Sequence, residues 1–332
     1  MYSNSIIDFI RCFTDVQINN GRGFTLVTGS GLYSELLGKK DILSSWPTLL
    51  SAVAEISGLK WKEDWKDMDP TLVWESMIIS KQLVMYNTTN DLRQANVLEK
   101  VMKKDLAHLL KKEWSTKVKV DRAAKAHKMV DVLMRLGWNA VIDLNFISLF
   151  HDNKSAKPAG RVHLTESISK SQRNQLCKYY ITSSGIPVFH PNGHVVNYST
   201  IRLGYRDYGL QSTALAWAFS KYKSVQHFHR LQENYRYSHS TWINHFMNDN
   251  LVFLGTGLSP MEIGLRWALS QKRRNYIKDV SSSNKPINIY FQSSTDKRSQ
   301  SSIRKLIASE CQQLDLNEIK LKSWEDFWKE FG

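Results

Sequence analysis

The chain has 332 residues, 42% of them hydrophobic, which is enough for one large domain or two ordinary ones with an apolar core. Its three cysteines lie far apart and form no CxxC pair, which excludes a zinc ribbon and a disulfide framework. The sequence opens without a signal-peptide pattern and contains no apolar run that could span a bilayer, so we expect a cytoplasmic protein without membrane contact. The formal net charge of +14 is spread over short basic runs, which suits a solvated surface, an anionic ligand, an acidic partner or nucleic acid.

The first predicted element is a buried parallel strand over "FTLVTG", residues 24–29, a β-branched and apolar run stopped by glycine. A helix is expected over residues 44–59, with Ser45 near its N-cap and Gly58 as its stop signal. In residues 69–136, apolar side chains recur at three- and four-residue steps with no strand between them. This stretch is predicted to form an all-helical insertion module.

Four further strands are predicted after Gly137, at "WNAVIDLNF", "GIPVFH", "NLVFLGTG" and "PINIYF", and a helix at 259–277 separates the last two. The tail from residue 302 reads as helix, short strand and helix. Strands that alternate with helices indicate an α/β fold, here a Rossmann-like parallel sheet with helices on both faces. Residues 1–68 and 137–332 would form this sheet domain, and residues 69–136 the helical insertion.

Two glycine turns follow predicted strands. In "LVTGSGLYSELLG", the turn Gly29, Ser30 and Gly31 would let backbone amides approach a pyrophosphate at a helix N-terminus. The third glycine of a dinucleotide fingerprint would fall on Ser34, so a plain tight turn is the alternative. In "LVFLGTGLSPMEI" the same pattern returns as Gly255, Thr256 and Gly257.

Polar residues end two other predicted strands. Asn145 closes "NAVIDLN", where its amide could orient a water or bind a ribose hydroxyl, or could simply form a turn. In "HPNGHV", His190 and Asn192 are two residues apart and would face the same side, and Gly193 would let the chain approach a ligand. His190 could act as a general base, or it could cap exposed backbone at the end of the strand.

The order of these motifs resembles that of the sirtuin-like NAD-cleaving domains of bacterial anti-phage defence proteins. The counterparts of the family elements are "TGSG", "DLNFI", "HPNG" and "FLGTGLSPME", and the likeness spans about residues 24–269. The resemblance implies that Gly29 to Gly31 hold the phosphates of NAD and that Gly255 and Thr256 line the ribose side.

The family asparagine, which would position the water or the nicotinamide ribose, matches Asn145. The family's catalytic histidine, the one just before glycine, falls on Asn192, which cannot act as a base at neutral pH. His190 or His194 could carry the proton instead, and we favour His190 because the strand fixes its direction. Other departures from the family pattern are Tyr33, Ile147 and Ser259.

The resemblance implies an NAD glycohydrolase that forms nicotinamide and ADP-ribose without a metal, and that acts in anti-phage defence by NAD depletion and abortive infection. Because the sirtuin-like part leaves little length for a sensor, we expect a partner protein, such as a nucleic-acid-processing ATPase, or a gating homo-oligomer. The alternative is a catalytically silenced, nucleotide-binding regulatory or scaffold subunit of a defence complex. A nucleic-acid-binding module is a third reading, supported by charge alone.

Overall fold

A computed structural model describes residues 21–38, 41–43, 45–89, 95–116, 126, 129–151, 179–221, 241–256, 262–276, 286–293 and 316–321. The two predicted helices of the tail lie outside these residues, as do Gly257 and Ser259.

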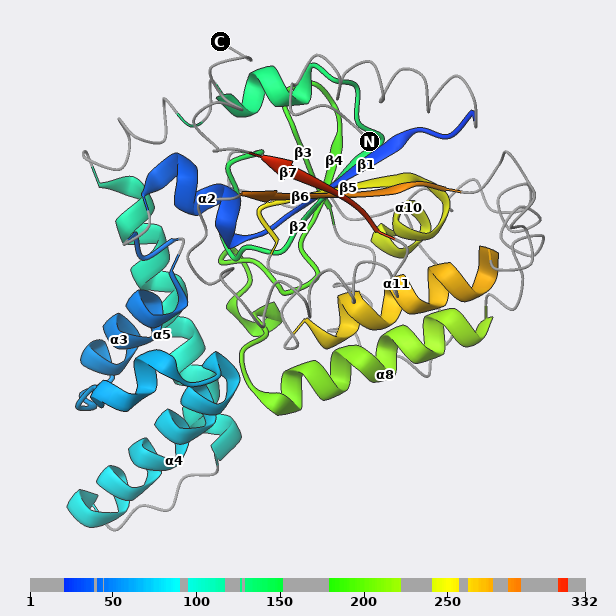
Figure 1. Cartoon of the computed structure of the whole chain (residues 1–332). Helices are drawn as coiled ribbons and strands as arrows, with labels where there is room; N and C mark the ends of the chain where they lie inside the picture. Colours follow the sequence, from blue (N-terminus) through cyan, green and yellow to red (C-terminus); the bar gives the residue numbers. More distant parts are fainter. Residues whose placement is uncertain are drawn as a thin grey trace.

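A seven-stranded, mostly parallel sheet forms the centre of the molecule, in the order β3-β4-β2-β1-β5-β6-β7 (Figure 1). Every pairing is parallel except that of β3 with β4, which is antiparallel. The strands are β1 Phe24–Thr28, β2 Ala140–Asp143, β3 Tyr179–Ile181, β4 Pro187–Phe189, β5 Asn250–Leu254, β6 Asn288–Ser293 and β7 Asn317–Leu321. The predicted α/β class with a largely parallel sheet is confirmed.

The central strands β1, β2 and β5 are buried along their whole length, because both faces of the sheet are covered. Alternate side chains enter two separate apolar clusters, one on each face. Leu26, Val141 and Val252 belong to the larger cluster, and their neighbours Val27, Ile142 and Phe253 belong to the smaller one. The apolar runs in the sequence are therefore two-sided core strands.

Helices lie on both sides of the sheet (Figure 1) and contribute side chains to both clusters. The larger cluster receives side chains from α2 Ser30–Leu37, α3 Trp46–Ile56, α4 Pro70–Thr89 and α5 Ala95–Ser115, and from the helical residues 129–134. The smaller cluster receives side chains from α8 Tyr205–Lys221, α10 Trp242–Asn248 and α11 Ile263–Tyr276. Two 3₁₀ helices, η1 Glu63–Asp67 and η2 Tyr198–Thr200, complete the described helices.

Local sequence signals set the bounds of α3 as expected. The Ser45 hydroxyl accepts a hydrogen bond from the Thr48 amide at 3.5 Å, and Pro47 stands in the first turn. Gly58, just beyond the helix, has a φ of +68°, a left-handed conformation that favours glycine.

Six of the seven strands coincide with predicted strands, while β3 was not predicted. This strand, which pairs with β4 at the edge of the sheet, has only three residues, too few to produce an alternating pattern.

In the described part of 69–136, α4, α5 and residues 129–134 are helical and no strand occurs. The division of the chain into a domain and an inserted module stays a prediction. No helix among the described residues is long and apolar enough to cross a membrane.

At β1 the chain changes the side of the sheet to which it adds strands. The chain runs outward from β1 to β2 and β4 on one side, and then returns to place β5, β6 and β7 on the other. Since β4, β2, β1 and β5 are parallel, the loops that follow them leave the sheet at one edge. The described residues of the predicted strand-end motifs therefore lie at this carboxyl edge.

The two glycine turns are in direct contact at this edge. Gly255 follows β5 with a φ of +67°, and a Cβ atom there would overlap the Leu32 amide nitrogen in the first turn of α2. A Cβ on Gly29 or Gly31 would in turn meet the Gly255 carbonyl oxygen, at 2.9 and 2.7 Å. These glycines allow two backbone segments to approach more closely than any side chain would permit.

A pair of glycine substitutions separates this contact from backbone strain. Gly58→Ala places alanine at nearly the same φ in open space, so it should lower the free energy of unfolding by about 1–2 kcal/mol. Gly255→Ala adds the overlap with Leu32 and should cost at least about 2 kcal/mol more. Urea unfolding of both variants measures the difference, and equal losses would show that the contact relaxes without cost.

Candidate functional site

The structure brings nearly all of the predicted site residues to the carboxyl edge. Gly29, Ser30 and Gly31 follow β1, and Gly255 and Thr256 follow the adjacent β5. On the other side of β1, Asn145 follows β2, while His190, Asn192 and Gly193 follow β4. Gly257 lies outside the described residues.

Two of the amides expected to face a phosphate are already paired within the protein. The Gly29 amide donates to the Leu254 carbonyl at 3.3 Å, and the Gly31 amide donates to the Gly255 carbonyl at 2.8 Å. The close packing of the two turns explains this pairing, because it brings the carbonyls at the end of β5 against the start of α2. The turn therefore holds β1, β5 and α2 together, and Ser30 is left at the N-terminus of α2, the end at which helices attract anions.

Thr256, beside this turn, carries a polar atom that lacks a partner among the described residues. The residue is 4% exposed, and its side-chain hydroxyl has no hydrogen-bond partner among the described residues. Its carbonyl accepts a hydrogen bond from the Tyr290 hydroxyl of β6 at 3.0 Å, which fixes the backbone. A buried hydroxyl without a partner is costly, and a ligand oxygen or a water would satisfy it.

Asp143, the last residue of β2, organises the other half of the edge. Its fully buried carboxylate accepts five hydrogen bonds. Oδ1 receives the Thr28 hydroxyl at 3.2 Å and the backbone and side-chain nitrogens of Asn145 at 3.1 and 2.8 Å, and Oδ2 receives the hydroxyls of Tyr33 and Ser148 at 2.7 and 2.9 Å. One side chain thus connects β1, α2 and the loop after β2.

Tyr33 of α2 extends this network. It donates to Asp143 and accepts a hydrogen bond from the Leu149 amide at 2.9 Å. Burial, reinforced by the negative charge of Asp143, raises the pKa of the Tyr33 hydroxyl well above its ordinary value, so the phenol stays neutral. Tyr33, a departure from the family pattern, is therefore a structural anchor for the loop.

Asn145 is held in one orientation by this carboxylate. Its Nδ2 and backbone amide both point to Asp143, so its side-chain oxygen is the acceptor that remains for a ligand. Its backbone carbonyl faces the Nδ1 of His190 at 3.0 Å. Because a carbonyl only accepts hydrogen bonds, Nδ1 of His190 carries the proton.

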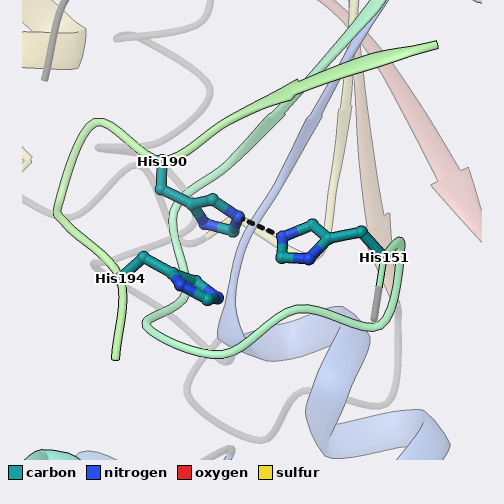
Figure 2. Close-up of side chains that lie close together, drawn as sticks. All are labelled: His151, His190 and His194. Atoms are coloured by element: carbon teal, nitrogen blue, oxygen red, sulfur yellow. Dashed lines mark hydrogen bonds between the residues drawn. The ribbon is translucent and has the colours of Figure 1, made fainter. Parts of the chain in front are cut away.

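His190 therefore presents an unprotonated Nε2, which lies 2.9 Å from Nε2 of His151 (Figure 2). In the neutral pair, His151 is the donor. Burial lowers the pKa of His190, and the attraction of Asp143 offsets this only in part. At neutral pH, His190 is therefore an uncharged imidazole with a lone pair at the strand end.

His194 lies beside this pair, and Figure 2 shows the three imidazole rings pointing toward one another. Its ring centre is 4.6 Å from that of His190 and 5.1 Å from that of His151. Burial lowers the pKa of His194 well below 6.5, and repulsion from Lys111 and from His190 and His151, when these are protonated, lowers it further. Tyr180 of β3 stacks on His151 with a centroid distance of 4.1 Å and covers one side of the cluster.

Asn192 and Gly193 have structural contacts at this edge. The side-chain Nδ2 of Asn192 donates to the Leu144 carbonyl at 3.2 Å, and the backbone carbonyl of Asn192 accepts a hydrogen bond from the Arg202 amide at 2.8 Å. Gly193 has a φ of +92°, and a Cβ atom there would overlap the Thr200 carbonyl. The close approach that requires this glycine is therefore made to Thr200 of η2.

Asp143 and His151 were not predicted as site residues from the sequence. A detectable signal for Asp143 was present, because a carboxylate in an otherwise apolar buried strand must find several donors. No local pattern marks His151, which follows an apolar loop and meets the other histidines only in the folded chain. Its contribution depends on the position of β4 beside β2.

Searches against protein-family models and against curated proteins found no match to this chain. The likeness to sirtuin-like domains therefore depends on the order of the strand-end motifs.

The hydrogen bonds of Asp143 predict a graded loss of stability. Asp143→Asn removes the charge and replaces an acceptor with a donor, so the free energy of unfolding should fall by about 3 kcal/mol. Thr28→Val keeps the shape of the side chain and removes only the longest of the five bonds, so it should cost about 1 kcal/mol. Urea unfolding compares the two variants, and a cost for Asp143→Asn no larger than that for Thr28→Val would contradict the central role of Asp143.

The lowered histidine pKa values predict a loss of stability in acid. Between pH 6.5 and 5.5 the unfolded chain binds protons that the buried His194 does not, so acidification favours unfolding. His194→Gln should make the unfolding free energy less dependent on pH in this window, by about 1 kcal/mol. Burial raises the pKa of Glu262 to about 7, so acidification makes this group favour the folded chain, opposite to the effect of His194. Because Glu262 is present in both proteins, the difference between parent and variant isolates the contribution of His194. Parallel curves for the two proteins would exclude the effect.

Proposed function

We propose that the chain binds NAD at the carboxyl edge of its sheet and hydrolyses it to nicotinamide and ADP-ribose. The observation that supports this most directly is the meeting of the glycine turns after β1 and β5 at the point where the strand order reverses. Open α/β sheets bind ligands outside the carboxyl ends of the strands at such a point. In this proposal the sheet is Rossmann-like, and residues 69–136 are its helical insertion.

The pyrophosphate of NAD would lie at the N-terminus of α2. The amides of Gly29 and Gly31 are paired, so binding would use the helix N-terminus at Ser30 together with the buried Thr256 hydroxyl. The positive net charge of the chain would favour the approach of this anionic ligand. Thr256 thereby acquires the partner that it lacks among the described residues.

The nicotinamide ribose would lie toward Asn145 and His190. Asp143 orients the Asn145 amide, whose oxygen could accept a hydrogen bond from a ribose hydroxyl or from the attacking water. His190 is neutral and fixed by the Asn145 carbonyl, so its Nε2 could accept a proton once His151 turns away. His190 thus takes the role of the histidine that Asn192 replaces.

The reaction requires little chemistry from the protein. The bond between ribose C1 and the nicotinamide nitrogen breaks with its electron pair leaving on nicotinamide, and C1 gains oxocarbenium character. The oxygen of one water then bonds to C1, and the water proton passes to His190. Positioning and electrostatic stabilisation are sufficient for such a step.

A defence role by NAD depletion would require the activity to be gated by a partner or by self-assembly. One helix has a surface suited to this: α4 exposes Ile79, Leu83 and Tyr86, at 56%, 57% and 45%. Apolar side chains grouped on one exposed helix face are typical of interaction sites.

The second candidate function is a silenced subunit that binds the nucleotide without cleaving it. Asn192 supports it, because its side chain ties the ends of β2 and β4 together and offers no proton acceptor. NAD binding without turnover would be its signature.

Incubation of the purified chain with NAD, followed by chromatography of nicotinamide, tests the proposal. We expect turnover in the parent and a loss of at least about 100-fold in Asn145→Ala, because the ribose or water loses its positioning group. Asn197→Ala is the matched control, since its side chain accepts only an exposed hydrogen bond from Ser199 among the described contacts. Circular dichroism confirms that each variant is folded.

Asn192→His separates the two candidate functions. Turnover gained only in this variant, with NAD bound by both proteins in calorimetry, would establish the silenced subunit. If neither protein binds NAD, both functions are excluded.

A further inference from the structure

We propose that His151, His190 and His194 form a binding site for a divalent transition-metal cation of the zinc class. This goes beyond the proposed NAD chemistry, which uses no metal. One ring nitrogen from each residue lies within 4.8 Å of those from the other two, and all three residues are buried. The rings come from three separate places, namely the loop after β2, the end of β4 and the turn that follows it (Figure 2).

The spacing of the nitrogens suits a metal after small ring rotations. Four-coordinate zinc binds imidazole nitrogen at about 2.0–2.1 Å, which places two ligand nitrogens about 3.4 Å apart. The Nε2 atoms of His151 and His190 lie 2.9 Å apart, and the ligand nitrogens of all three rings lie within 4.8 Å of one another. A cation therefore requires the His151–His190 pair to open slightly and His194 to settle at the same spacing from both.

The protonation state of the cluster is also suitable. Metals bind neutral imidazole, and burial keeps His190 and His194 uncharged at neutral pH. Nδ1 of His190 donates to the Asn145 carbonyl, which directs the Nε2 lone pair into the cluster. A ligand histidine typically makes this kind of second hydrogen bond, which fixes its tautomer and its orientation.

Binding requires two local changes in protonation. His151 holds a proton on Nε2 in its bond to His190, so metal binding moves this proton to Nδ1 and replaces the bond with two metal–nitrogen bonds. Nδ1 of His194 accepts a long hydrogen bond from the Val196 amide, 3.3 Å away, so the neutral ring carries its proton on Nε2. Binding through Nε2 would move this proton to Nδ1 and break the bond to Val196. Both lost bonds are weak compared with metal–imidazole bonds.

Three imidazole ligands select for a particular group of ions. Nitrogen donors suit Zn²⁺, Co²⁺, Ni²⁺ and Cu²⁺, whereas Mg²⁺ and Ca²⁺ prefer oxygen. A site with three protein ligands also keeps a fourth position for water. An occupied site would engage the Nε2 lone pair of His190, so metal binding and the proton acceptance proposed for His190 exclude each other.

Titration of the full-length, EDTA-treated chain with Co²⁺ and Zn²⁺ tests the site. We expect one ion per chain, visible absorption bands of four-coordinate Co²⁺, and loss of these bands when Zn²⁺ displaces it. In His151→Gln the affinity for both ions should fall at least about tenfold. His108→Gln, at an exposed position on α5, is the control and should leave the affinity unchanged.

Absence of Co²⁺ bands and of Zn²⁺ uptake in the folded parent would overturn the proposal, as would full affinity in a folded His151→Gln. If that variant does not fold, His190→Gln and His194→Gln are titrated in the same way, and the parent measurement remains decisive. No NAD is present in the titration, so a negative result leaves the NAD proposal intact. Equally, failure of the NAD assay says nothing against metal binding.

Discussion

The carboxylate of Asp143 is the interaction on which the candidate site depends. It has no exposure to solvent, so its charge is tolerable only because five donors surround it. Those donors come from the central strand, from the first helix and from the loop that carries Asn145. The need to satisfy one buried charge therefore fixes the positions of Asn145 and, through its carbonyl, of His190.

The glycine turns have a structural role that precedes any role in binding. Gly255 and Gly31 let two backbones touch, and the resulting hydrogen bonds consume amides that a free turn would offer to a phosphate. A glycine-rich strand end is thus ambiguous, because close packing and anion binding require the same absence of a side chain. The Thr256 hydroxyl, which has no partner among the described residues, is the feature of this edge that close packing does not explain.

The sequence predicted the sheet better than the site. Runs such as those of β1 and β5 are recognisable because both faces are buried, and the capping pattern around Ser45 and Pro47 marks its helix directly. The edge strand β3 was missed since three residues carry no periodicity. Asn145 and His190 were identified from strand ends, whereas His151 was not, because its place depends on long-range pairing between strands that local patterns do not encode.

The central position of β1 has a consequence for how the molecule assembles. One side of this strand pairs with β2, but the other pairs with β5, and Phe24 finds its neighbour Asn250 only far along the chain. During synthesis from the N-terminus, an apolar strand therefore waits with one row of hydrogen-bonding groups open while most of the polypeptide emerges from the ribosome. The nascent chain is then vulnerable to aggregation and a natural client for chaperones, and the glycine turns after β1 and β5 meet only at a late step.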